Sequence, residues 1–189
     1  AMVVLWLLAL PLAVLGGWFA ATRITDRGGL RIFGGVAWAL APTFLTALIE
    51  GRPAAVLAHL LLPWLFHTAT VAHRSWGAAG AASIVLAATI ACAPSLAPAL
   101  IVLWLLAIII VLSRAWFHGA VRLLWMLAPT AVLFAPLAFW QAQTGQLWSV
   151  FADPGAVWAG AQVGADPAGR LVLASGFPTA DLAGWMDVL

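Results

Sequence analysis

The sequence has no lysine and no tyrosine, a single cysteine and few acidic residues. Charged residues make up 7% of its 189 residues and comprise 8 arginines and 6 acidic residues. About a quarter of the residues in a soluble domain are charged, so this chain cannot cover itself with a water-soluble surface. The positive charge comes from scattered arginines, and we therefore expect no nucleic-acid-binding face.

The scarcity of cysteine and the lack of known motifs exclude several kinds of chemistry. Cys92 is the only cysteine, so neither a disulfide framework nor a cysteine metal site is available. His59 and His67 have no obvious third ligand at a suitable spacing, and a zinc site is not expected. The sequence also contains no GxSxG, no HExxH and no glycine-rich phosphate loop. No metal or other cofactor is predicted.

Long apolar stretches dominate the sequence, with 65% hydrophobic residues and a mean hydropathy of +1.09. A membrane-spanning helix needs about 20 mainly apolar residues, and charges recur here at intervals of that size. Residues 1–140 are therefore predicted to form an all-α, polytopic transmembrane bundle of about six helices, at residues 3–21, 32–49, 54–71, 76–93, 96–112 and 123–139. The glycine pairs 16–17 and 34–35 predict close helix packing. Residues 141–189 predict an irregular extracytoplasmic or interfacial tail, and we expect the chain to be an excerpt of a longer protein.

The arginines alternate between the predicted connections. Arg52 is alone in the second connection and the fourth has none, whereas the first, third and fifth hold Arg23, Arg27, Arg31, Arg74, Arg114 and Arg122. Short cytoplasmic loops of membrane proteins collect positive charge. We therefore predict that both termini lie outside the plasma membrane of a bacterium. Abundant Ala, Trp and Arg without Lys indicates a GC-rich genome, as in actinobacteria.

A polar stripe is predicted on the third span. Arg52, His59 and Pro63 follow one another at spacings of seven and four residues, which places them on one helical face. Polar groups at membrane depth are costly, so we expect this face to lie against other helices or a cavity. The stripe predicts either a groove for a polar or anionic ligand, or histidines that hydrogen-bond to neighbouring helices. His67, near the cytoplasmic end, is expected to be solvated.

Glu50, Arg52 and His59 are the candidate substrate-binding residues. The planar guanidinium of Arg52 suits a phosphate group, and Pro53 in the first turn of the third span leaves a positive helix N-terminus beside it. The alternative is a local ion pair between Glu50 and Arg52 that only completes the loop. The Asp-Pro-Gly sequence at residues 153–155 predicts a turn.

Three stretches resemble a known family. Residues 35–42 read GVAWALAP, residues 50–65 read EGRPAAVLAHLLLPWL, and residues 151–155 read FADPG. These stretches look like the membrane portion of large actinobacterial family 2 glycosyltransferases, in which a cytoplasmic glycosyltransferase domain is joined to a many-helix region. The resemblance implies a membrane segment that works with other domains or subunits of a larger glycosyltransferase.

A polar outer loop with Gly-Arg, followed by a helix with a central proline, is also similar to the later helices of C-type glycosyltransferases. Those enzymes take a sugar from a polyprenyl-phosphate carrier at the outer face and need an acidic residue in an early outer loop. Asp26 is predicted on the cytoplasmic side, so no such residue precedes Glu50 in this chain. The resemblance thus implies a carrier-binding or scaffold part, whose catalytic residues are not all present here.

Two functions follow as hypotheses. The first is the membrane segment of a glycosyltransferase in cell-envelope polysaccharide assembly, with membrane lipid and a polyprenyl-phosphate-linked sugar as its partners. The alternative is a non-enzymatic membrane module, either a transporter subunit or an assembly scaffold. The spans contain no pair of carboxylates typical of ion-coupled transport, which disfavours the transporter.

Overall fold

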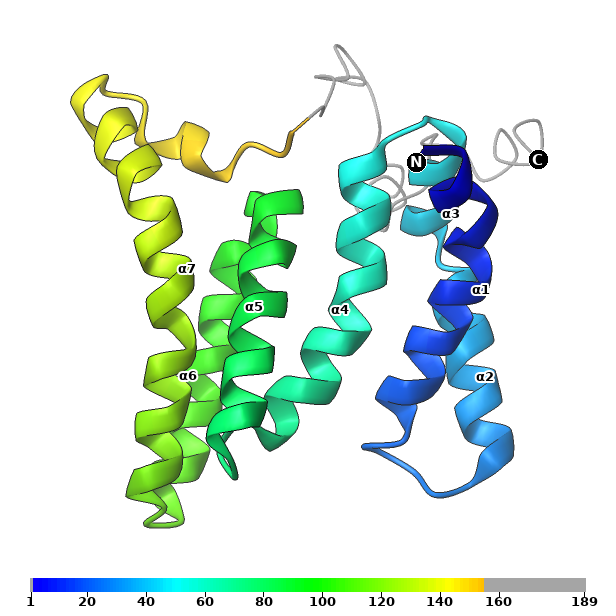
Figure 1. Ribbon diagram of the computed structural model, residues 1–189, viewed down its shortest axis with the longest axis horizontal. Coiled ribbons are helices and arrows are strands. Elements are labelled where there is room, and N and C mark those ends of the chain that lie inside the picture. The colour runs from blue at the N-terminus through cyan, green and yellow to red at the C-terminus, as the bar shows by residue number, and fades with distance from the viewer. Residues whose placement is uncertain (1, 155–189) are drawn as a thin grey trace, which may run out of the picture.

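The structure, a computed structural model, describes residues 2–154, and these form helices without any strand (Figure 1). The expected all-α class is confirmed for this part of the chain. Residues 155–189 of the expected tail lie outside the described residues. In chain order the helices are α1 (Met2–Ala21), α2 (Gly28–Ala39), α3 (Pro42–Ile49), α4 (Pro53–Ala72), α5 (Trp76–Cys92), η1 (Pro94–Leu96), α6 (Ala97–Ser113), α7 (Phe117–Gln143) and η2 (Leu147–Phe151).

Several of these helices are long and apolar enough to cross a membrane. Four segments qualify alone: α1, α4, α7 and the continuous stretch of η1 and α6. The pair of α2 and α3 gives a fifth candidate if its two helices, which are bent by 41°, form one span. α5 is apolar but has 17 residues, about 26 Å at 1.5 Å per residue. The described chain thus has four or five candidate spans, and a sixth depends on α5.

The expected span at residues 32–49 is interrupted in the structure. α2 ends at Ala39, and Ala41 has an extended ψ of 131° immediately before Pro42 begins α3. A proline ring clashes with a preceding residue that is in the helical conformation. Pro42 therefore separates two helices where the apolar pattern predicted one. Pro63, in contrast, lies inside α4.

The last long helix extends beyond the expected span 123–139 at both ends and has 27 residues. It takes in Arg122, whose Nη1 donates to the carbonyl oxygens of His73 at 3.0 Å and Arg74 at 2.7 Å. Carbonyl groups at the end of a helix have no partner within it, and here Arg122 bonds to those of the two residues that directly follow α4. The charged residue therefore joins α7 to α4 instead of marking the start of a helix.

α2 and α3 run in the same general direction, with a bend of 41° between them, and the other long helices run alternately up and down (Figure 1). The remaining connections therefore gather at two ends. The connections α1–α2, α4–α5 and α6–α7 lie at one end, at the bottom of the view, and the arginine-rich sequence belongs to them. The α3–α4 connection, η1 and η2 lie toward the opposite end. We call the first of these the arginine-rich end.

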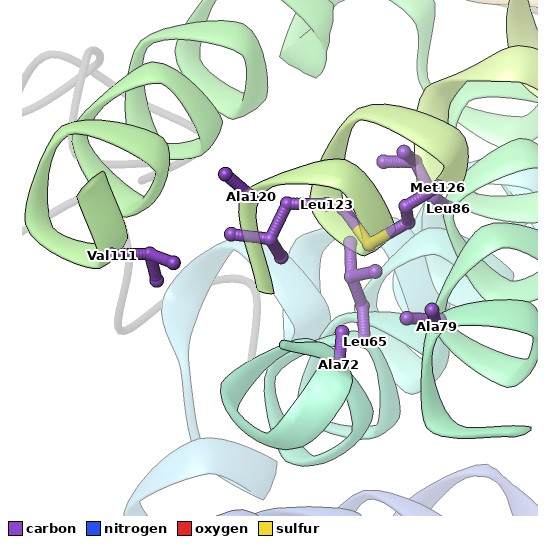
Figure 2. Packing of buried hydrophobic residues seen from close by; sticks show 9 residues of the cluster. Leu65, Ala72, Ala79, Leu86, Val111, Ala120, Leu123 and Met126 are labelled. Atoms are coloured by element: carbon purple, nitrogen blue, oxygen red, sulfur yellow. The ribbon is translucent and has the colours of Figure 1, made fainter. Parts of the chain in front are cut away.

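Two apolar clusters hold the helices together, and α4 contributes to both. The first joins α4 to α1, α2 and α3 through Ala9, Ala13, Ala39, Phe44, Ala47, Val56 and Leu60. The second joins α4 to α5, α6 and α7 through Leu65, Ala72, Ala79, Ala82, Leu86, Val111, Ala120, Leu123 and Met126 (Figure 2). The α4 residues of the first cluster precede Pro63 and those of the second follow it. α4 therefore contributes to one apolar cluster before Pro63 and to the other after it.

Candidate functional site

The loop that carries Glu50 and Arg52 has a defined backbone. Gly51 has a φ of 66°, its N–H bonds to Leu48, and the N–H of Arg52 bonds to Ala47. These two bonds form a Schellman motif, which ends a helix best when glycine occupies the left-handed position. The sequence Glu-Gly-Arg-Pro thus stops α3 and starts α4 within four residues.

Arg52 and Glu50 form an ion pair in this loop. The Nε of Arg52 lies 2.7 Å from Oε2 of Glu50, and the two side chains are 39% and 36% exposed. The local pair expected as the alternative is therefore present. Because it engages Nε, the Nη side of the guanidinium is the part suited to a phosphate group. The role of Arg52 in phosphate binding stays a prediction.

His59 lies between two aromatic rings, 8% exposed. Its ring stacks on Trp38 of α2 at 4.3 Å and on Phe44 of α3 at 4.4 Å. Its Nε2 donates to the carbonyl oxygen of Trp38 at 2.9 Å, and the Trp38 indole donates to the carbonyl oxygen of His59 at 3.3 Å. The expected burial of His59 and of Pro63 against other helices is confirmed. The contacts are those of a histidine bonded to a neighbouring helix.

His67 is not simply solvated, so that expectation is wrong. It is partly buried, its Nδ1 donates to the carbonyl oxygen of Phe19 at 3.1 Å, and its Nε2 accepts from Nη2 of Arg23 at 3.0 Å. Both partners come from the end of α1. Nothing in the local sequence of α4 points to them, because they lie more than 40 residues away in the chain.

The candidate residues therefore form separate contacts. Arg52 pairs with Glu50 at the loop, whereas His59 bonds to Trp38 inside the bundle. Pro63, the third member of the stripe, lines a different feature, an apolar groove with a volume of about 670 Å³. The sequence predicted a groove for a polar or anionic ligand at the stripe, whereas the groove that Pro63 lines is apolar.

The apolar groove lies between α1, α2 and α4 on one side and α5, α6 and α7 on the other. Leu62, Phe66 and Leu103 are among its lining residues, and none of the described residues that line it is charged. Trp104 also lines it, and its indole N–H donates to the carbonyl oxygen of Leu123 at 2.8 Å, which leaves the apolar ring for the groove. The groove is therefore suited to a hydrocarbon chain.

Asp153 makes a contact that its turn sequence did not indicate. Its carboxylate accepts from the backbone N–H of Ser95 at 2.9 Å and from the Ser95 hydroxyl at 2.7 Å. These charge-assisted bonds attach the segment after η2 to the turn between α5 and α6. Asp153 therefore has a structural partner in this position.

Among residues 2–154, no group of three or more His, Cys, Asp or Glu side chains could hold a metal ion. Residues 2–154 are all-helical, with several helices of the length and composition that cross a membrane. Comparisons of the chain with protein families, with curated proteins and with solved structures find no match.

Proposed function

We propose that this chain is the membrane segment of a glycosyltransferase of cell-envelope polysaccharide assembly, and that it holds a polyprenyl-phosphate-linked sugar. The observation that supports this most is the apolar groove between the two groups of helices. Its volume of about 670 Å³ and its uncharged lining suit a long hydrocarbon chain. Ligand pockets of a few hundred to about 1,000 Å³ with apolar walls are typical of sites that enclose small molecules.

Arg52 is the residue proposed for the carrier phosphate. Its ion pair with Glu50 fixes one side of the guanidinium, and Pro53 leaves the N-terminus of α4 beside it. Pro63, ten residues after Pro53 on the same helix, reaches the groove. A polyprenyl chain is long enough to run from a phosphate at the loop into the groove.

The proposal includes six crossings of the plasma membrane with the arginine-rich end in the cytoplasm. α2 and α3 together then form one broken span. α5 crosses as a short helix, which is sheltered by α4 and α7 on its two sides (Figure 1). An even number of crossings returns η2 to the side on which α1 begins. The Arg52 loop then faces outside, where lipid-linked sugars of the envelope are used.

Binding of a polyprenyl-phosphate analogue to the purified chain tests the role of Arg52. A charge-assisted phosphate contact is worth about 1.5–3 kcal/mol, so Arg52→Ala should weaken binding roughly ten- to a hundred-fold. Arg52→Lys keeps the charge and should lose less. Arg27→Ala removes an exposed arginine from the opposite end and serves as the control.

The role of the groove in binding is tested by a substitution that places a large side chain in it. Ala107 lines the groove and Ala99, on the same helix, is exposed outside it. Ala107→Trp should weaken binding of a long-chain analogue but not of a short-chain phosphate, whereas Ala99→Trp should change neither. Equal binding by the wild type and all these variants would remove both Arg52 and the groove from the site. A non-enzymatic scaffold would then be the better account.

A further inference from the structure

A second pocket lies at the arginine-rich end, between the α4–α5 and α6–α7 turns. Its volume is about 540 Å³, and its lining residues are His73, Arg74, Ala115, Trp116, Phe117, His118, Gly119 and Arg122. Two arginines and two histidines thus surround one space, and no acidic residue among residues 2–154 lines it. We call this the basic pocket.

The positive charge of the basic pocket is not balanced by acids elsewhere in residues 2–154. Asp26 pairs with Arg31 at 2.9 Å, Glu50 pairs with Arg52 at 2.7 Å, and Asp153 bonds to Ser95. These are all the acidic residues of the described part of the chain. The pocket therefore has a positive charge for which this part of the structure supplies no partner.

The pKa of His73 reflects the same positive charge. Burial lowers its pKa, and the charges of Arg74, Arg114 and Arg122 lower it further. The ring of His73 stacks on Trp116 at 5.4 Å, and the guanidinium of Arg114 lies over the same indole at 5.8 Å. Three arginines thus act on one point of the pocket wall.

Arg122 is held in place before any ligand arrives. Its Nη1 donates to the carbonyl oxygens of His73 and Arg74, and its guanidinium lies over the Trp76 ring at 5.7 Å. Its Nε is buried and has no hydrogen-bond partner among the described residues. A guanidinium that is already fixed in place loses little conformational freedom when it binds an acceptor such as a phosphate oxygen.

The turn beside the pocket has a strained backbone. Ala115 has a φ of 56°, the left-handed conformation in which residues other than glycine are disfavoured. Gly119 lets α7 approach α4 closely, because a Cβ there would lie 3.0 Å from Val111 and 3.3 Å from His73. Residues other than glycine with a left-handed backbone, such as Ala115, cluster at binding sites.

The surroundings of the pocket point to a lipid. Trp116 and Phe117 are 46% and 67% exposed at the point where α7 begins. Exposed aromatic side chains at helix ends are typical of the membrane interface, the level of the lipid headgroups. Basic pockets between membrane helices on the cytoplasmic side bind anionic headgroups.

We propose that the basic pocket binds the phosphate group of an anionic phospholipid at the membrane interface. Arg74 and Arg122 contact the phosphate oxygens, and His118 adds a donor. The acyl chains lie along the exposed apolar faces beside α7. This site is at the end opposite to Arg52, so it neither requires nor replaces the binding of a lipid-linked sugar there.

Native mass spectrometry of the full chain in detergent tests the proposal by counting bound phosphatidylglycerol and phosphatidylcholine. The test variant is Arg74→Gln combined with His118→Gln, because both side chains are exposed and Arg122 also holds the end of α4. The control is Arg27→Gln, which removes an exposed charge from the same end but outside the pocket. Thermal unfolding of each variant confirms that it is folded.

The double variant should bind phosphatidylglycerol roughly tenfold or more weakly than the wild type, with phosphatidylcholine unchanged. Arg27→Gln should differ by less than about threefold. Equal losses in the control and the double variant would show a general charge effect and overturn the site. Unchanged binding in the double variant would overturn it too. Displacement of the lipid by millimolar inorganic phosphate would instead identify a site for a soluble anion.

Discussion

His59 joins three helices through one side chain. It extends from α4, stacks on one ring from α2 and another from α3, and bonds to the backbone of Trp38. Each ring contact is worth about 0.5–1.5 kcal/mol and the hydrogen bond about 1 kcal/mol. The side chain therefore contributes to the attachment of both α2 and α3 to α4.

Replacing His59 by alanine should lower the free energy of unfolding by about 2–4 kcal/mol, the sum of those contacts. The matched control is His118→Ala, since His118 is exposed. Thermal unfolding of both variants in the same detergent measures the difference. If His118→Ala destabilised the chain as much as His59→Ala, the role given to His59 would be wrong.

His73 should titrate below its ordinary pKa of 6.5, because burial and then the neighbouring Arg74 disfavour its charged form. The unfolded chain then binds the proton more readily than the folded chain. The contribution of His73 to stability is thus complete above about pH 6.5 and falls as the pH drops from there toward the lowered pKa. Imidazole chemical shifts followed by NMR measure this pKa. Arg74→Gln should raise it, and a wild-type value of 6.5 or higher would contradict the account.

The sequence predicted the burial of His59 but not its partners. The spacing of Arg52, His59 and Pro63 placed them on one helical face. Because polar groups are costly in a membrane, that face was predicted to lie against other helices or a cavity. Trp38 and Phe44 lie in another predicted span, so only the tertiary arrangement brings them to His59. The apolar groove was not predictable for the same reason, since its walls come from six helices.

Two glycines allow α1 and α2 to pack closely. A Cβ on Gly35 would lie 2.6 Å from the carbonyl oxygen of Val14, and one on Gly17 would lie 2.8 Å from Cβ of Trp38. The expectation that the glycine pairs permit close packing is confirmed at these two positions. Membrane helices lack a hydrophobic driving force toward one another, so close contact through small residues stabilises such pairs.

Alanine at Gly35 should destabilise the chain by about 1–3 kcal/mol, because the backbone of α1 must move away. The control is Gly80→Ala in α5, where a Cβ would meet nothing within 4 Å. Glycine is about 1 kcal/mol less favourable than alanine inside a helix, so this change should stabilise instead. The thermal midpoint of unfolding should fall for Gly35→Ala and rise for Gly80→Ala. If both midpoints shifted in the same direction, the close contact at Gly35 would not determine how α1 and α2 pack.

Helix ends were predictable where charge, proline and glycine coincide, as at Glu50 to Pro53. The break before Pro42 was missed because it lies in an apolar stretch without charges, where only the effect of proline on the preceding residue marks it. Pro63 also lies in an apolar stretch, but it does not divide α4 into two helices. The start of α7 was placed too late because Arg122, taken as a loop residue, bonds to the end of α4 instead.

At the scale of the whole molecule, the connections alternate between two ends, and the arginines gather at one of them (Figure 1). This arrangement accounts for the charge pattern if α1, the pair α2 and α3, and each of α4 to α7 cross the membrane. A re-entrant α2 and α3 would instead place the Arg52 loop and the α1–α2 loop on the same side. The side on which each connection lies therefore decides the number of crossings.

Labelling of single thiols in intact cells by a membrane-impermeant maleimide measures this directly. In a Cys92→Ala background, one cysteine at a time replaces Gly28, Ile49, Gly77, Ser95 or Gln146; Gly51 is avoided because its φ is 66°. Ile49, Ser95 and Gln146 should be labelled in intact cells, whereas Gly28 and Gly77 should react only after the membrane is permeabilised. Labelling of Gly28 in intact cells, or Ile49 reacting like Gly28, would contradict the six-crossing arrangement.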